Sequence, residues 1–300
     1  MTQRSGPGAS GPLLAPLLVV VIAFSMQSGS ALATKVIGAV GVVDANWLRT
    51  ATAALVLIAV RPRSLRLPPR GQRLTVALLA LSLLCMNLSF YGAISVAPLG
   101  IVVAIEFSGP LVVAVVGSRR PVDLVWVALA AAGIVALVGP SGSVGLTGLA
   151  LALSAGLFWG LYLVFARRAV GVLEPLQVTT LMFSGSVLVL TPVALLFGSR
   201  LVHHPSAVAL GVVVGLVSSA APYFLELVAL RLVRAATYSE LLSLEPAIAA
   251  LTGFVVVGQT LSRLDVAAIV MVMIAAAGAS VSAARLHAAA PLPPDGGAPL

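Results

Sequence analysis

The chain has 300 residues, of which 60% are hydrophobic and only 9% charged, and its mean hydropathy is +1.14. A soluble domain carries about 25% charged residues, so this composition excludes an ordinary soluble fold and indicates a protein dissolved in lipid. The net charge is +8, but the basic residues lie in short gaps between apolar runs, which is not the pattern of a nucleic-acid-binding surface. The single cysteine, Cys85, excludes an intramolecular disulfide and a cysteine metal cluster.

Apolar runs long enough to cross a bilayer recur along the chain. A transmembrane helix needs about 20 mostly apolar residues, and charges, prolines and glycines mark where each run ends. Backbone polar groups cannot stay unpaired against lipid, and the runs do not alternate as barrel strands do, so we predict an all-α membrane protein of ten helices. The predicted spans are Leu13–Thr34, Asp44–Val60, Leu74–Ala97, Gly100–Gly117, Val122–Gly139, Leu146–Phe165, Leu176–Phe197, Ala207–Leu230, Ala235–Val257 and Leu264–Ala284.

Basic residues follow every second span. Cytoplasmic loops are enriched in Lys and Arg, so this alternation predicts that both termini are cytoplasmic in an inner (plasma) membrane. Lys35, Arg200 and Arg263 fall on the opposite side, and Arg49 falls within the second span. The other 13 of the 17 basic residues share one side: Arg4, Arg61, Arg63, Arg66, Arg70, Arg73, Arg119, Arg120, Arg167, Arg168, Arg231, Arg234 and Arg285.

The chain also contains an internal repeat. Ala93–Pro110 and Ala229–Pro246 are blocks of equal length that run from one predicted span into the next, and Asp123 and Gln259 occupy matching positions beyond the two prolines. Five spans per half turn the second copy upside down, which is typical of transporters with a substrate site between the halves. We therefore predict two five-helix repeats with disordered tails. The boundaries are 1–12 for the N-terminal tail, 13–140 and 141–287 for the repeats, and 288–300 for the C-terminal tail.

The N-terminus allows a second interpretation. Arg4, the apolar run Leu13–Phe24 and the small residues Ser30–Ala33 also resemble a signal peptide with its cleavage site. Cleavage would leave nine spans and break the repeat.

Ionisable residues within the spans are candidates for function, because a charge in the middle of a bilayer costs a few kcal/mol or more. The acids are Glu106, Glu226, Glu240 and Glu245, and Arg49 is the base. Four acids against one base leave carboxylates for a proton or for a cationic group of a substrate. The alternative for each acid is a buried ion pair or a hydrogen bond to the backbone, and Arg49 could instead snorkel to the membrane interface.

Amide and aromatic residues inside the spans are candidates to line a solute path, although each could equally serve helix packing or interface anchoring. These residues are Gln27, Asn87, Tyr91, Trp159, Tyr162 and Tyr223. The sequence contains no H-E-x-x-H, G-x-S-x-G or P-loop motif, which argues against an enzyme and against an ATP-driven pump. No cluster of metal ligands is found, and neither a metal nor another cofactor is expected.

Two blocks of sequence resemble a known family. Pro98–Pro110, which reads PLGIVVAIEFSGP and continues through Ser118–Asp123, is very similar to EamA-type transporters of the drug/metabolite transporter superfamily. Ala221–Tyr223 with Glu226, and then Ser243–Ala247, match the pattern of the second half. The resemblance is closest to the threonine/homoserine exporters of the RhtA type, and it covers nearly the whole chain apart from the tails.

This resemblance implies ten helices in two inverted repeats and the proton-coupled export of small neutral amino acids. It carries Glu106, Glu226 and Glu245 over as substrate or proton-coupling residues, and Arg49 is our candidate partner for the substrate carboxylate. The expected partners are thus the solute, protons and membrane lipid. Two departures leave the substrate open: Gln259 stands where an acid often follows glycine, and Glu240 is an added acid.

Three alternatives to amino-acid export are kept. The first is an exporter of other metabolites or drugs on the same fold. The second is a membrane enzyme acting on lipid-linked substrates, and the third is a non-transporting membrane scaffold or sensor. A membrane enzyme should gather polar residues at one membrane face, whereas the acids here fall inside the spans.

Overall fold

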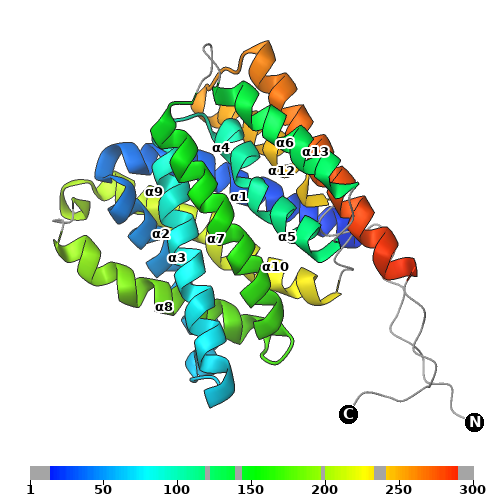
Figure 1. Cartoon of the computed structure of the whole chain (residues 1–300). Helices are drawn as coiled ribbons and strands as arrows, with labels where there is room; N and C mark the ends of the chain where they lie inside the picture. The colour runs from blue at the N-terminus through cyan, green and yellow to red at the C-terminus, as the bar shows by residue number, and fades with distance from the viewer. Residues whose placement is uncertain (1–13, 119–121, 139–143, 197–199, 233–240, 290–300) are drawn as a thin grey trace, which may run out of the picture.

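The computed structural model describes residues 14–118, 122–138, 144–196, 200–232 and 241–289, and every regular element within them is helical (Figure 1). The α-helices of the first half are α1 (Leu14–Val40), α2 (Val42–Val60), α3 (Arg73–Ile94), α4 (Leu99–Glu106), α5 (Ser108–Ser118) and α6 (Asp123–Val138). Those of the second half are α7 (Leu146–Val170), α8 (Pro175–Leu196), α9 (Pro205–Gly215), α10 (Ala221–Leu232), α12 (Glu245–Thr252) and α13 (Arg263–Ala289). The 3-10 turns are η1 (Pro62–Leu65), η2 (Arg70–Gln72) and η3 (Leu201–His203), and the π-helical turns are η4 (Leu216–Ala220) and η5 (Gly253–Val257).

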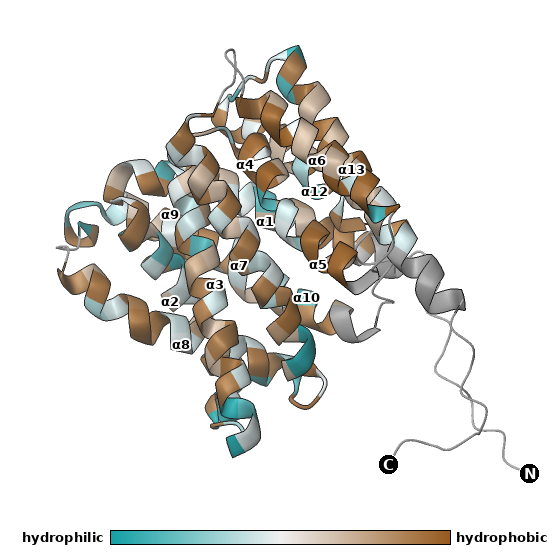
Figure 2. Cartoon of the chain, viewed as in Figure 1, coloured by the Kyte–Doolittle hydropathy of each residue, from teal (hydrophilic) through white to brown (hydrophobic). Residues whose placement is uncertain are grey.

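Eight helical stretches in the described part of the chain are long and apolar enough to cross a membrane. Two further apolar segments, Asp123–Val138 and Glu245–Val257, are shorter. Figure 2 shows hydrophobic residues along the lengths of the helices and hydrophilic residues gathered mainly at helix ends. The prediction of an all-α, multi-pass membrane protein is confirmed.

Several boundaries differ from the sequence prediction. Helix α1 continues six residues past the predicted end at Thr34, so Lys35 lies exposed on a helix rather than in a loop. The reversal between α1 and α2 then needs one residue, Gly41, whose φ of 88° lies in the left-handed region that glycine adopts readily. At the other end, α13 reaches Ala289, two residues beyond the predicted repeat boundary.

The fourth predicted span consists of two helices, α4 and α5, that meet at Phe107. The cause lies in the sequence: Pro110 has no N–H, so the carbonyl of Glu106 loses its helical donor. The ninth span is broken at the matching place, with a turn at Ser243–Leu244 just before Glu245 and Pro246. Both breaks therefore set a glutamate at an interruption of the helical backbone.

Close packing joins the two halves of the chain. Helix α3 lies along α7, α2 along α8, and α6 along α13 (Figure 1), while α1 contacts α9, η4 and α10. Small residues allow the closest approach, which lies between α5 and α7: a Cβ added to Gly109 would lie 1.7 Å from the carbonyl oxygen of Gly156. These contacts enclose a group of buried polar side chains between the halves. That group includes Arg49, Asn87, Glu106, Ser218, Ser219, Glu226 and Glu245.

Candidate functional site

The side chain of Arg49 lies at the centre of this polar group. It projects from α2 and is only 3% exposed, so it does not snorkel to a membrane surface. Its Nη1 donates to Oδ1 of Asn87 at 3.0 Å, its Nη2 donates to the carbonyl oxygen of Ser218 at 3.2 Å, and its Nε donates to Oγ of Ser219. A guanidinium has five N–H donors. The hydrogen bonds above use three of these donors, and the side chains of Tyr91 and Tyr223 also interact with the guanidinium.

The partners from the second half come from an irregular stretch of helix. Ser218 and Ser219 belong to the π-helical turn η4, which interrupts the span formed by α9 and α10. Isolated π-helical turns are frequent at functional sites, because the widened turn changes where side chains point and which carbonyls are paired. Here the turn presents a backbone carbonyl and a hydroxyl to the same guanidinium.

Two tyrosine rings flank the guanidinium. The Cζ atom of Arg49 lies 5.2 Å from the ring centre of Tyr91 and 5.8 Å from that of Tyr223, within the range of a cation–π interaction. Tyr223 in turn packs edge-on against Phe183 and Tyr162, with ring centres 5.3 Å and 6.0 Å apart. The aromatic rings thus keep water away from a charge that is held by short polar contacts.

Three carboxylates lie around this centre, and all are buried: Glu106 is 7% exposed, Glu226 is 4% and Glu245 is 5%. Glu226 accepts a hydrogen bond from the hydroxyl of Tyr162 at 3.2 Å. Glu106 interacts electrostatically with Arg49, and Glu245 interacts electrostatically with both other glutamates. One buried cation and three buried acids therefore share one region of low dielectric constant.

The structure brings most of the predicted site residues together, but not all of them. The connected set consists of Arg49, Asn87, Tyr91, Glu106, Tyr162, Tyr223, Glu226 and Glu245. Trp159 is buried and packs edge-on against Phe107, next to the break that carries Glu106. Gln27 is buried on α1 with its Oε1 atom unpaired among the described residues, and no polar contact joins it to Arg49. Glu240 lies outside the described residues.

Some residues of the site were missed by the sequence analysis. Ser218 and Ser219 were available as a signal, because they form a polar pair inside an otherwise apolar run that leads into Pro222. Phe183 carried no signal, since nothing in the sequence distinguishes it from other buried aromatic residues. The role of Gln259 was also missed: its Oε1 accepts a hydrogen bond from the backbone N–H of Leu99 at 3.0 Å and so caps the start of α4.

Comparisons with known proteins identify the family of the chain. Residues 146–281 match the EamA-like transporter family. The chain is 39% identical over 280 residues to the threonine/homoserine exporter RhtA of Salmonella typhimurium. The aligned region covers 91% of this chain and 94% of that protein. It is 38% identical over 280 residues to the threonine/homoserine exporter RhtA of Escherichia coli K12, covering 90% and 93% of the two chains.

The fold also has a solved counterpart. A protein described only as "Crystal structure of protein" superimposes with a TM-score of 0.65 at 21% identity, covering 92% of this chain and 99% of that one. Such a likeness shows the fold alone, whereas the exporters match in sequence over nearly their full length. The chain therefore belongs to the EamA-like transporter family, and it is a membrane transporter rather than an enzyme.

Proposed function

We propose that this protein exports small neutral amino acids such as threonine and homoserine across a bacterial inner membrane. The observation that carries the proposal is the buried guanidinium of Arg49, held by groups of both halves of the chain, with three buried glutamates around it. An amino acid carries a carboxylate and an ammonium group, and this arrangement offers an opposite charge to each. The relatives from Salmonella typhimurium and Escherichia coli K12 are threonine/homoserine exporters, which supports the same substrate class.

In this proposal the substrate carboxylate binds the guanidinium of Arg49, because a planar guanidinium matches a carboxylate with two parallel hydrogen bonds. The ammonium group binds among Glu106, Glu226 and Glu245. The hydroxyl of Tyr91 is buried beside Arg49 and is the proposed contact for a polar side chain of the substrate.

The proposed architecture is ten spans in two inverted five-helix repeats with both termini cytoplasmic. Its support is the pairing of helices: each half gives one partner to the pairs α2 with α8, α4 with α12, and α6 with α13. The contact of α3 with α7 has its counterpart in the contact of α9, η4 and α10 with α1, as a pseudo-twofold relation between the halves requires. The alternation of basic loops supports the orientation.

We further propose that proton movement drives export. The three buried glutamates around Arg49 exceed the one arginine that is buried among the described residues, and protons or the substrate ammonium would neutralise that excess. Rocking of one repeat against the other would then expose the site to each side of the membrane in turn.

The test is the efflux of labelled threonine from preloaded cells, with and without an uncoupler, at matched amounts of protein in the membrane. Wild-type protein should accelerate efflux, and the uncoupler should abolish the acceleration. Glu106→Gln should lose it as well. Arg49→Gln should also lose it, whereas Arg200→Gln, which removes an equal charge from an exposed position, should transport normally.

Two outcomes would contradict the proposal. Efflux equal to that of cells without the protein would remove threonine and favour another metabolite or drug on the same fold, which a competition panel would identify. Full efflux by Glu106→Gln that the uncoupler still abolishes, as in wild type, would remove this carboxylate from coupling.

A further inference from the structure

A second polar site lies away from Arg49, where the connection between α2 and α3 meets the start of α8. This connection carries several arginines between Arg61 and Arg73. It joins two helices that are each long enough to span a membrane, so it lies at a membrane surface whichever way the chain is oriented. A cavity of about 270 Å³ opens there. It is lined by Arg61, Arg63, Ser64, Arg66, Val172, Leu173, Glu174 and Gln177.

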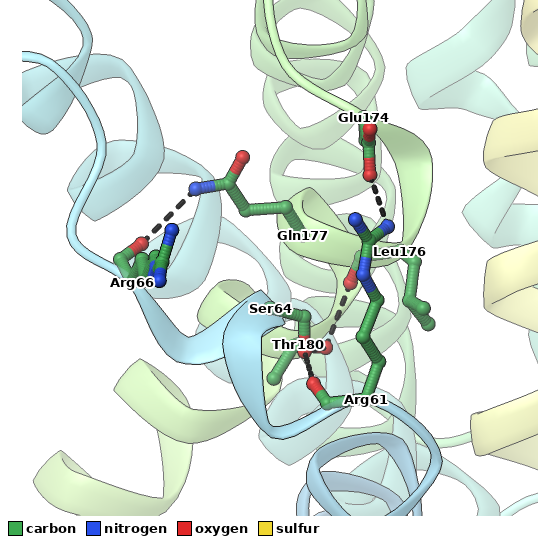
Figure 3. A network of polar contacts seen from close by, with 7 residues as sticks. All are labelled: Arg61, Ser64, Arg66, Glu174, Leu176, Gln177 and Thr180. Carbon is green, nitrogen blue, oxygen red and sulfur yellow. Dashed lines mark hydrogen bonds and ion pairs between the residues drawn. The ribbon is translucent and has the colours of Figure 1, made fainter.

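The cavity carries an excess of positive charge. Arg61 forms an ion pair with Glu174 (Figure 3). Arg63 and Arg66 are exposed and have no acidic partner among the described residues. Three arginines against one glutamate leave a net charge of +2 on the lining. This charge suits an anion with two negative oxygens, or a phosphodiester that more than one arginine contacts.

The walls of the cavity are fixed by contacts between the two halves of the chain (Figure 3). The hydroxyl of Ser64, which is buried on η1, lies 2.9 Å from that of Thr180 on α8. The amide of Gln177 donates to the backbone carbonyl of Arg66 at 3.0 Å. The backbone that carries the arginines is therefore held in place before any ligand arrives, which lowers the entropic cost of binding.

Apolar side chains stand exposed beside the charges. Leu65, Leu67 and Leu74 are 44%, 75% and 70% exposed, and Val172 on the opposite wall is 62% exposed. A soluble anion would make no use of these side chains, whereas a phospholipid offers a phosphate to the arginines and acyl chains to the leucines. Basic pockets between transmembrane helices bind anionic headgroups in this manner.

We propose that this cavity binds the phosphate headgroup of an anionic phospholipid such as phosphatidylglycerol. Arg63 and Arg66 contact the phosphate, and Glu174 limits the affinity by neutralising Arg61. The site is independent of the transport site, so its failure would leave the proposed export untouched. Bound lipid would tie the α2–α3 connection to the start of α8, and hence one half of the chain to the other.

The experiment is a titration of the purified full-length protein in detergent with phosphatidylglycerol, followed by native mass spectrometry. Arg63→Gln/Arg66→Gln should weaken binding of the first lipid about thirtyfold, from roughly one kcal/mol for each of the two arginines near a lipid headgroup. Arg70→Gln/Arg73→Gln is the matched control, because it removes the same charge from the same connection outside the cavity, and it should weaken binding less.

Glu174→Gln provides a test in the opposite direction. It frees Arg61 and should tighten binding, a gain that misfolding cannot produce. Equal weakening by the two double variants would overturn the proposal in favour of diffuse attraction to charge. Displacement of the lipid by millimolar inorganic phosphate alone would overturn it in favour of a site for a soluble anion.

Discussion

The crossing of α5 and α7 predicts that Gly109→Ala is strongly destabilising. The added Cβ would lie 1.7 Å from the carbonyl oxygen and 2.5 Å from the carbonyl carbon of Gly156. Both atoms are backbone, so no side chain can move aside, and the helices must separate by roughly 1.7 Å to reach an ordinary contact. Overpacking of a tight core costs about 1–3 kcal/mol, and a clash with backbone belongs at the upper end of that range.

The consequence should extend to function, because Glu106 is three residues before Gly109 and its carbonyl oxygen is itself close to Gly156. A Cβ at Gly156 would lie 2.6 Å from that oxygen. We expect Gly109→Ala to lower the midpoint of thermal unfolding in detergent and to reduce threonine efflux at equal expression.

The matched control is Gly38→Ala. Gly38 is also helical, on α1, but an added Cβ meets nothing within 4 Å. Alanine is favoured over glycine inside a helix by about 0.5–1 kcal/mol, so this variant should be neutral or slightly stabilised. Equal unfolding midpoints for the two variants would refute the tight crossing.

Three further predictions concern single contacts. Arg49→Lys keeps the charge but loses the fork that reaches three partners, so efflux should fall by about tenfold or more, and efflux close to wild type would contradict this role. Gln259→Ala removes the cap from Leu99 and should lower the free energy of unfolding by about 1 kcal/mol, whereas Gln259→Glu keeps an acceptor and should lose less. In a double-mutant cycle on thermal unfolding, Arg61 and Glu174 should couple by less than about 1 kcal/mol, because their side chains are 51% and 60% exposed; a larger coupling would indicate a buried pair.

The candidate site was predicted in its residue types better than in its contacts. Glutamate and arginine inside apolar runs stand out in any sequence, because lipid makes an unpaired charge costly. Arg49 was nevertheless equally compatible with snorkelling to an interface, since its distance from the membrane surface depends on how α2 packs. Only the packed helices show that its guanidinium points inward.

The breaks in the fourth and ninth spans were visible in part. Pro110 and Pro246 are obvious in the sequence, and a proline removes a backbone donor wherever it stands. These prolines disturb the helices more than the sequence suggested. The fourth span is divided into the separate helices α4 and α5, and in the ninth span α12 begins only after the turn at Ser243–Leu244. The π-helical turn at Ser218 and Ser219 had no comparable signal, because no residue type specifies an extra residue in a turn.

The sequence by itself determined that this protein lies in a lipid bilayer and that its fold is all-helical. A chain with 60% hydrophobic residues and few charges enters lipid, where the backbone must pair its own polar groups, and helices do so locally. The tertiary structure alone decided which side chains meet, as Arg49 and its partners on η4 lie about 170 positions apart. The reason is physical: hydropathy fixes which segments enter the membrane, whereas the hydrogen bonds that hold a buried charge come from whichever helices pack beside it.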